Sequence, residues 1–65
     1  MEIGNVYIVK ESSGQPRKIK LLEKTKETYY IEFLDLKHKP KKTYLIDNFN
    51  SDYKIIETFG LEIPF

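Results

Sequence analysis

The chain has 65 residues, which is enough for one small hydrophobic core and too few for two. It contains no cysteine and one histidine, so neither a disulfide framework nor a structural zinc site is available, and we expect no metal and no other cofactor. Eleven basic and ten acidic residues leave a formal net charge of +1. A domain this small has little room for a deep catalytic pocket, so we expect that the protein is not an enzyme.

The composition is that of a folded protein. Hydrophobic residues make up 40% of the chain and aromatic residues 14%, which is enough apolar surface to offset the chain entropy. No apolar run approaches the roughly 18 residues of a membrane span, and the first residues lack the basic and apolar regions of a signal peptide. We therefore expect a single domain, residues 1–65, in the cytoplasm and away from membranes.

Charge is distributed unevenly along the chain. Residues 1–46 contain ten basic and six acidic side chains, a net charge of +4, whereas residues 47–65 contain one basic and four acidic side chains, a net charge of −3. Such an asymmetry can orient a small protein toward a charged partner, although a nearly neutral total weakens general affinity for nucleic acid.

Segments rich in β-branched and aromatic residues predict five strands separated by polar turns. The predicted strands are residues 5–10, 17–23, 28–36, 43–46 and 53–58. The polar residues 11–16 predict a loop after the first strand, and the basic residues 37–42, which include a proline, predict a loop before the fourth.

Alternation within the predicted strands indicates which side chains face the core. In the third strand, Tyr29, Ile31 and Phe33 share one face, which we expect to be the core face. The complete predicted core consists of Val6, Ile8, Ile19, Leu21, Ile31, Phe33, Leu45 and Ile55.

The last third of the chain allows more than one interpretation. Residues 47–52 have short polar side chains that bond to nearby backbone groups, which predicts a turn or a single helical turn. Residues 53–58 are compatible with a strand or with a short helix that begins after Ser51 and ends at Gly60. We favour the strand, because β-branched and aromatic residues dominate the segment and few residues remain for a helix.

The chain begins its first strand with Gly4-Asn5-Val6-Tyr7, and Phe49, Tyr53 and Ile56 are spaced as Phe-x-x-x-Tyr-x-x-Ile near its end. With the order of predicted elements, these residues resemble the compact SH3-like domains found in bacterial and phage-borne small proteins. The resemblance covers nearly the whole chain and implies an all-β, five-stranded SH3-like small barrel with a one-turn helix before the last strand. The sequence lacks the acidic first loop and the tryptophan with which peptide-binding SH3 domains hold proline helices.

No catalytic or nucleotide-binding set of residues is predicted. His38 lies between lysines in a polar loop, where the neighbouring positive charge disfavours a general base. Two Asp-x-Lys sequences, at Asp35 and at Asp52, match part of a nuclease motif, but about 1.5 acid-x-Lys matches are expected by chance in this composition. The three glycines are isolated and form no phosphate-binding loop.

Basic side chains with two tyrosines as stacking platforms form the first candidate site, for nucleic acid. Its residues are Arg17, Lys18, Lys20, Lys24, Lys26, Tyr30, Lys37, Lys39, Lys41, Lys42 and Tyr44. Alternatively, these lysines have no binding role and only keep the strand edges and loops solvated.

The apolar tail, residues 59–65, is the second candidate site. Its alternating apolar side chains are those of Phe59, Leu61, Ile63 and Phe65. The tail either covers the protein's own barrel or docks on another chain as an edge strand.

Two functions follow from these features. The first is a protein-binding module, an adaptor or inhibitor of the kind that phages and other mobile elements encode, acting as a monomer or a homodimer. The alternative is a nucleic-acid-binding small barrel that uses the basic hairpin and loop surface.

Overall fold

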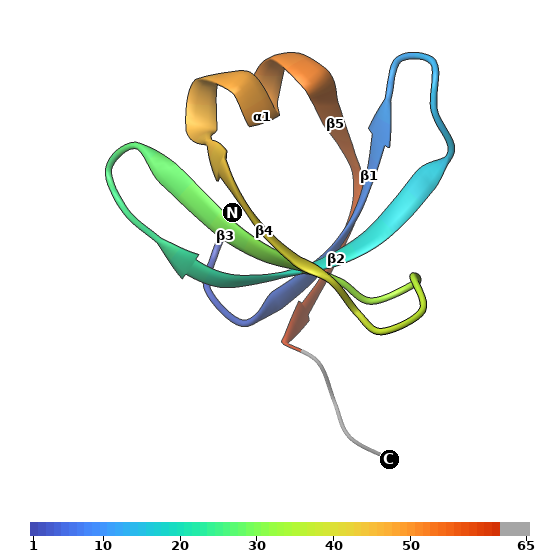
Figure 1. Cartoon of the computed structure of the whole chain (residues 1–65), viewed down its shortest axis with the longest axis horizontal. Coiled ribbons are helices and arrows are strands. Elements are labelled where there is room, and N and C mark those ends of the chain that lie inside the picture. Colours follow the sequence, from blue (N-terminus) through green and yellow to red (C-terminus); the bar gives the residue numbers. More distant parts are fainter. Residues whose placement is uncertain (62–65) are drawn as a thin grey trace.

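Five antiparallel strands and one short helix make up residues 1–61, the part of the chain that the computed structural model describes (Figure 1). The elements in chain order are β1 (Asn5–Glu11), β2 (Pro16–Lys24), β3 (Thr28–Phe33), β4 (Lys41–Leu45), α1 (Ile46–Asp52) and β5 (Tyr53–Leu61). The expected all-β architecture is confirmed. Residues 53–58 are in a strand, as favoured from the sequence, and this strand continues to Leu61.

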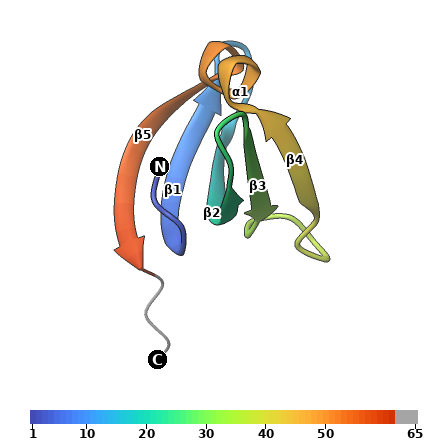
Figure 2. The same ribbon diagram turned by 90° about the vertical axis from the view of Figure 1, so that its left-hand side faces the viewer.

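The sheet has the order β4-β3-β2-β1-β5, so β4 and β5 are its two edges. In Figure 2 the strands lie side by side in this order, and α1 crosses one end of the sheet to join the two edges. Among residues 1–61 no backbone ladder connects β4 with β5. The sheet is strongly curved (Figure 1) but open, and it does not form the closed barrel expected from the sequence.

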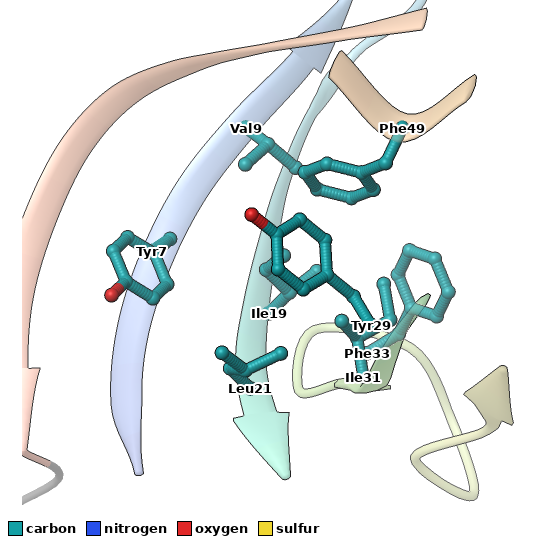
Figure 3. Close-up of a cluster of buried hydrophobic side chains, with 8 residues drawn as sticks. All are labelled: Tyr7, Val9, Ile19, Leu21, Tyr29, Ile31, Phe33 and Phe49. Carbon is teal, nitrogen blue, oxygen red and sulfur yellow. The ribbon is translucent and has the colours of Figure 1, made fainter. Parts of the chain in front are cut away.

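Pairing between strands determines which side chains share the core face. Ile19 pairs with Phe33 and Leu21 pairs with Ile31, so these four side chains lie on one face of the central strands. The buried cluster in Figure 3 consists of Tyr7, Val9, Ile19, Leu21, Tyr29, Ile31, Phe33 and Phe49. The predicted inward orientation of Tyr29, Ile31 and Phe33 is confirmed.

The predicted face of β1 was wrong. Tyr7 pairs with Ile19 and therefore lies on the core face together with Val9, whereas Ile8 is half-buried on the opposite face. Val6 is buried but is not part of the central cluster. Four consecutive apolar residues in this strand contain no alternation from which its face could be read.

Leu45 and Ile55 are not core residues, contrary to the prediction. Leu45 pairs with Thr28, one position from the inward-facing Tyr29, so its side chain lies on the opposite face and is 52% exposed. Ile55 pairs with Val9 on the core face, but β5 is an edge strand, and the side chain is 44% exposed.

Helix α1 is anchored by one aromatic side chain. Phe49 is 1% exposed and packs edge-on against Tyr29, with ring centroids 5.5 Å apart, and stacks on Tyr53 at 5.0 Å. The seven residues of α1 are mostly poor helix formers, and the residue before it makes no side-chain capping bond. Burial of Phe49 therefore stabilises this helix more than intrinsic propensity does.

Backbone bonds and turn conformations fix the connections on either side of β3. The N–H of Ile46 donates to the carbonyl oxygen of Glu27 at 2.8 Å, which ties the start of α1 to the turn before β3. In the loop between β3 and β4, His38 and Lys39 have φ angles of 69° and 45°, so two consecutive side-chain-bearing residues are left-handed. This reversal lets β4 begin at Lys41, two residues earlier than predicted.

Replacing Phe49 by alanine should lower the free energy of unfolding by about 3–5 kcal/mol, because the substitution removes a buried ring and leaves a cavity. A domain of this size has only a few kcal/mol of net stability, so most of the variant should be unfolded at 25 °C. Phe59, which is 57% exposed, provides the matched control, and its alanine variant should lose less than about 1 kcal/mol. Urea and thermal denaturation followed by circular dichroism measure both, and equal losses would contradict this account of the core.

Candidate protein interface along the last strand

Exposed apolar side chains concentrate on β5. Three of the five large hydrophobic residues that are substantially exposed within the described chain belong to this strand: Ile55, Ile56 at 51% and Phe59. The other two, Ile3 and Leu45, lie outside β5. Single exposed hydrophobic residues are ordinary, but three on one strand form a patch.

Two irregularities in the pairing of β5 with β1 explain part of this exposure. Val9 pairs with Ile55 and Ile8 with Glu57, so Ile56 is an extra residue without a partner on β1. Phe59 is a second extra residue, between Thr58 and Gly60. Bulged residues of this kind redirect side chains and bend the strand. The bulges thus present Ile56 and Phe59 to solvent.

The backbone of β5 also has unpaired hydrogen-bonding groups beside this patch. Hydrogen bonds to β1 occupy one edge of the strand, and no other strand of residues 1–61 pairs with its second edge. An unpaired edge offers N–H and C=O groups to another extended chain. We call this unpaired edge, together with Ile55, Ile56 and Phe59, the β5 edge.

A hollow of about 290 Å³ lies beside the start of the β5 edge. It is lined by residues from the β1–β2 connection, the end of α1 and the start of β5: Lys10, Glu11, Ser12, Asn50, Ser51, Asp52, Tyr53, Lys54 and Ile56. Further hollows of about 260 and 380 Å³ lie at the turn between β2 and β3 and beside the start of α1. His38 is exposed in its loop and lines none of these three hollows.

Tyr53 connects the β5 edge to the aromatic cluster around Phe49. Its hydroxyl lies 3.5 Å from that of Tyr44, so the two edge strands touch through side chains where α1 joins them. Partial burial raises the pKa of the Tyr53 phenol above its ordinary value of 10.0, and hydrogen bonds to Tyr44 and Glu11 act in the same direction.

The basic residues proposed as a nucleic-acid site are distributed over four parts of the structure. Lys18, Lys20 and Lys41 lie on the face opposite the core, which we call the outer face; Lys24 and Lys26 lie at the β2–β3 turn; Lys37 and Lys39 lie in the β3–β4 loop; and Arg17 and Lys42 lie on the core face. The β2–β3 turn and the β3–β4 loop are at opposite ends of β3. The structure therefore does not gather these cations into one patch.

Acidic neighbours divide the basic surface further. Glu32 lies between Lys20 and Lys41 in one row of the outer face, and its carboxylate is 3.6 Å from the Lys41 ammonium. Arg17 is 3.7 Å from Asp35.

The two proposed stacking tyrosines lie on different faces of the sheet. Tyr30 is half-buried on the outer face, where it pairs with Thr43. Tyr44 faces the core side, packs against Phe49 and is covered by the Lys42 ammonium at 5.0 Å from its ring centroid. The structure therefore does not bring the two rings together into a single stacking platform.

The proposed apolar tail is only partly within the described chain. Phe59 and Leu61 belong to β5, whereas Ile63 and Phe65 lie outside the described residues. Ile56 was not among the predicted site residues, and Ile55 was predicted to lie in the core. Two adjacent isoleucines interrupt the alternation of this strand, and that interruption is the signal from which a bulge could have been predicted.

Comparison of the chain with protein-family models, with curated proteins and with solved structures finds no match in any of the three. No helix within residues 1–61 is long and apolar enough to cross a membrane. In the same residues, no group of three or more His, Cys, Asp or Glu side chains is arranged to hold a metal ion.

The raised pKa of Tyr53 predicts a loss of stability in alkali. Above about pH 10 the unfolded chain releases this proton while the folded chain retains it, so the free energy of unfolding falls as the pH rises. Between about pH 9 and pH 11 the melting temperature of the parent should fall more steeply than that of Tyr53→Phe. Tyr30→Phe, which removes a phenol outside the aromatic cluster, is the control and should follow the parent; parallel curves for Tyr53→Phe and the parent would contradict the prediction.

Proposed function

We propose that the chain is a small protein-binding module, an adaptor or inhibitor, whose interface is the β5 edge. The observation that carries the proposal is the coincidence of an unpaired strand edge with three exposed apolar side chains on the same strand. A strand edge supplies main-chain hydrogen bonds to a partner. The neighbouring apolar side chains supply hydrophobic area that becomes buried when the partner binds. Neither feature alone distinguishes an interface from an ordinary surface.

The mode of binding that suits this edge is addition of an extended segment from the partner. The segment would pair with β5 and cover Ile56 and Phe59, while the hollow beside Ile56 would receive one of its side chains. A single strand of nine residues buries an area at or below the low end of stable interfaces, about 1,200 Å² in total. Binding should therefore be reversible.

We also propose that the open sheet is related to SH3-like small barrels. The position of the last strand beside the first, with a short helix before it, supports this relationship. Because small barrels of this kind serve many unrelated functions, the proposed function depends on the β5 edge and not on the fold.

Ile56→Lys tests the proposed interface. The substitution places a charge in the middle of the β5 edge and should abolish binding of a protein partner without affecting the fold, because the side chain is half exposed. Leu45→Lys is the matched control: Leu45 is 52% exposed on the other edge strand, and this variant should bind like the parent. Partners captured from nuclease-treated lysate would be purified and titrated against parent and variants by calorimetry.

A salt series separates this function from nucleic-acid binding. Affinity for an apolar edge should change little between 50 and 200 mM salt, whereas phosphate-driven binding falls by orders of magnitude over this range. If Ile56→Lys and Leu45→Lys changed the affinity for the partner equally, the β5 edge would not be the interface. Binding that disappears with nuclease treatment and with Lys39→Glu plus Lys41→Glu would instead support the nucleic-acid alternative.

A further inference from the structure

The described part of β5 carries two charged residues of opposite sign, Lys54 and Glu57. Lys54 pairs with Lys10 and Glu57 pairs with Ile8, two positions apart on β1. Because residues two apart on a strand share a face, Lys54 and Glu57 lie on the same face of the sheet. Both side chains are exposed.

This shared face is a consequence of the bulge at Ile56. In a regular strand, residues three positions apart point to opposite faces. The extra residue shifts the alternation by one, so that Lys54 and Glu57 flank the bulge on the same side. In chain order the β5 edge therefore carries a cation, two isoleucines and an anion, with both charges on the outer face and Ile55 on the core face.

Within residues 1–61, Lys54 and Glu57 have no oppositely charged partner. Neither Lys54 nor Glu57 takes part in the salt bridges of residues 1–61, which join Arg17 to Asp35 and Lys41 to Glu32. Lys54 is directly opposite another cation, Lys10, and like charges opposite each other in a sheet are unfavourable. A carboxylate approaching from the free side of β5 would relieve this arrangement.

We propose that the occupant of the β5 edge is a second copy of this chain, paired antiparallel about a two-fold axis between Ile55 and Ile56. In this arrangement Lys54 lies opposite the partner's Glu57, and the symmetry repeats the contact with the roles exchanged. Along the paired strands the four isoleucines lie at the centre, and the charge pairs lie before and after them on the outer face. The inference rests on the proposed function, since it names the partner of the same edge.

Other features of the molecule favour this pairing. The net charge of +1 gives little repulsion between copies. The other edge strand, β4, has five residues and begins with Lys41 and Lys42, a basic edge of the kind that opposes pairing between copies. A contact of β5 with β5 closes on itself, and the bulge at Phe59 of each copy limits it to the few residues around its centre.

Charge reversal tests both the dimer and its register. The parent should self-associate in sedimentation equilibrium at concentrations up to about 1 mM. Lys54→Glu and Glu57→Lys each place like charges opposite one another at both ends of the contact, and each should weaken dimerisation by roughly tenfold or more. An equimolar mixture of the two variants restores attraction at both ends, so a heterodimer should form at parental concentrations. The double variant Lys54→Glu plus Glu57→Lys should likewise recover the homodimer.

Each alternative outcome has a definite meaning. A parent that stays monomeric at about 1 mM overturns the homodimer. Single variants that dimerise like the parent, or a mixture no more associated than its components, overturn the register. The proposed function fails separately, when Ile56→Lys leaves both self-association and the binding of every other protein unchanged. Circular dichroism melts of all variants establish that each is folded.

Discussion

The packing of Phe49 against three tyrosines holds the two edge strands of this sheet, β4 and β5, to each other. Strand order leaves β4 and β5 unpaired with each other, and backbone hydrogen bonds therefore do not close the structure. Phe49 of α1 packs against Tyr44 on one edge strand and Tyr53 on the other, whose rings also contact each other, and it reaches Tyr29 on β3. Aromatic contacts thus replace a ladder at the end where α1 joins the edges, while the rest of the β5 edge remains available.

Much of the sheet could be predicted from the sequence, because polar turns separate its strands and alternation marks one face of β3. The same reasoning failed for β1, since Val6 to Val9 are all apolar and only the pairing with β2 selects Tyr7. The role of Phe49 could not be predicted either. Its helix shows no apolar repeat, and its burial depends in part on Tyr29, which is twenty positions earlier in the chain.

The candidate interface was predictable in kind but not in position. Apolar residues near the end of the chain indicated an exposed edge, and Phe59 belongs to it. The two adjacent isoleucines indicate a bulge, but the sequence could not reveal that the edge extends back to Ile55, because its exposure depends on β5 being an edge strand beside β1. The basic residues illustrate the converse. Lys26 and Lys37 were predicted in one basic site, but they lie at opposite ends of β3.

The pairing of Asn5 with Leu61 places the start of β1 and the end of β5 at the same end of the sheet. A pulling force applied to the chain just before β1 and just after β5 would act across this pair, perpendicular to the strands. The hydrogen bonds between the two strands would then be loaded one after another instead of all together. Such an arrangement should separate at low force, beginning at the pair of Asn5 with Leu61 and ending where Tyr53 joins the aromatic cluster. Force applied at these two points therefore opens the β1–β5 ladder pair by pair from its outer end.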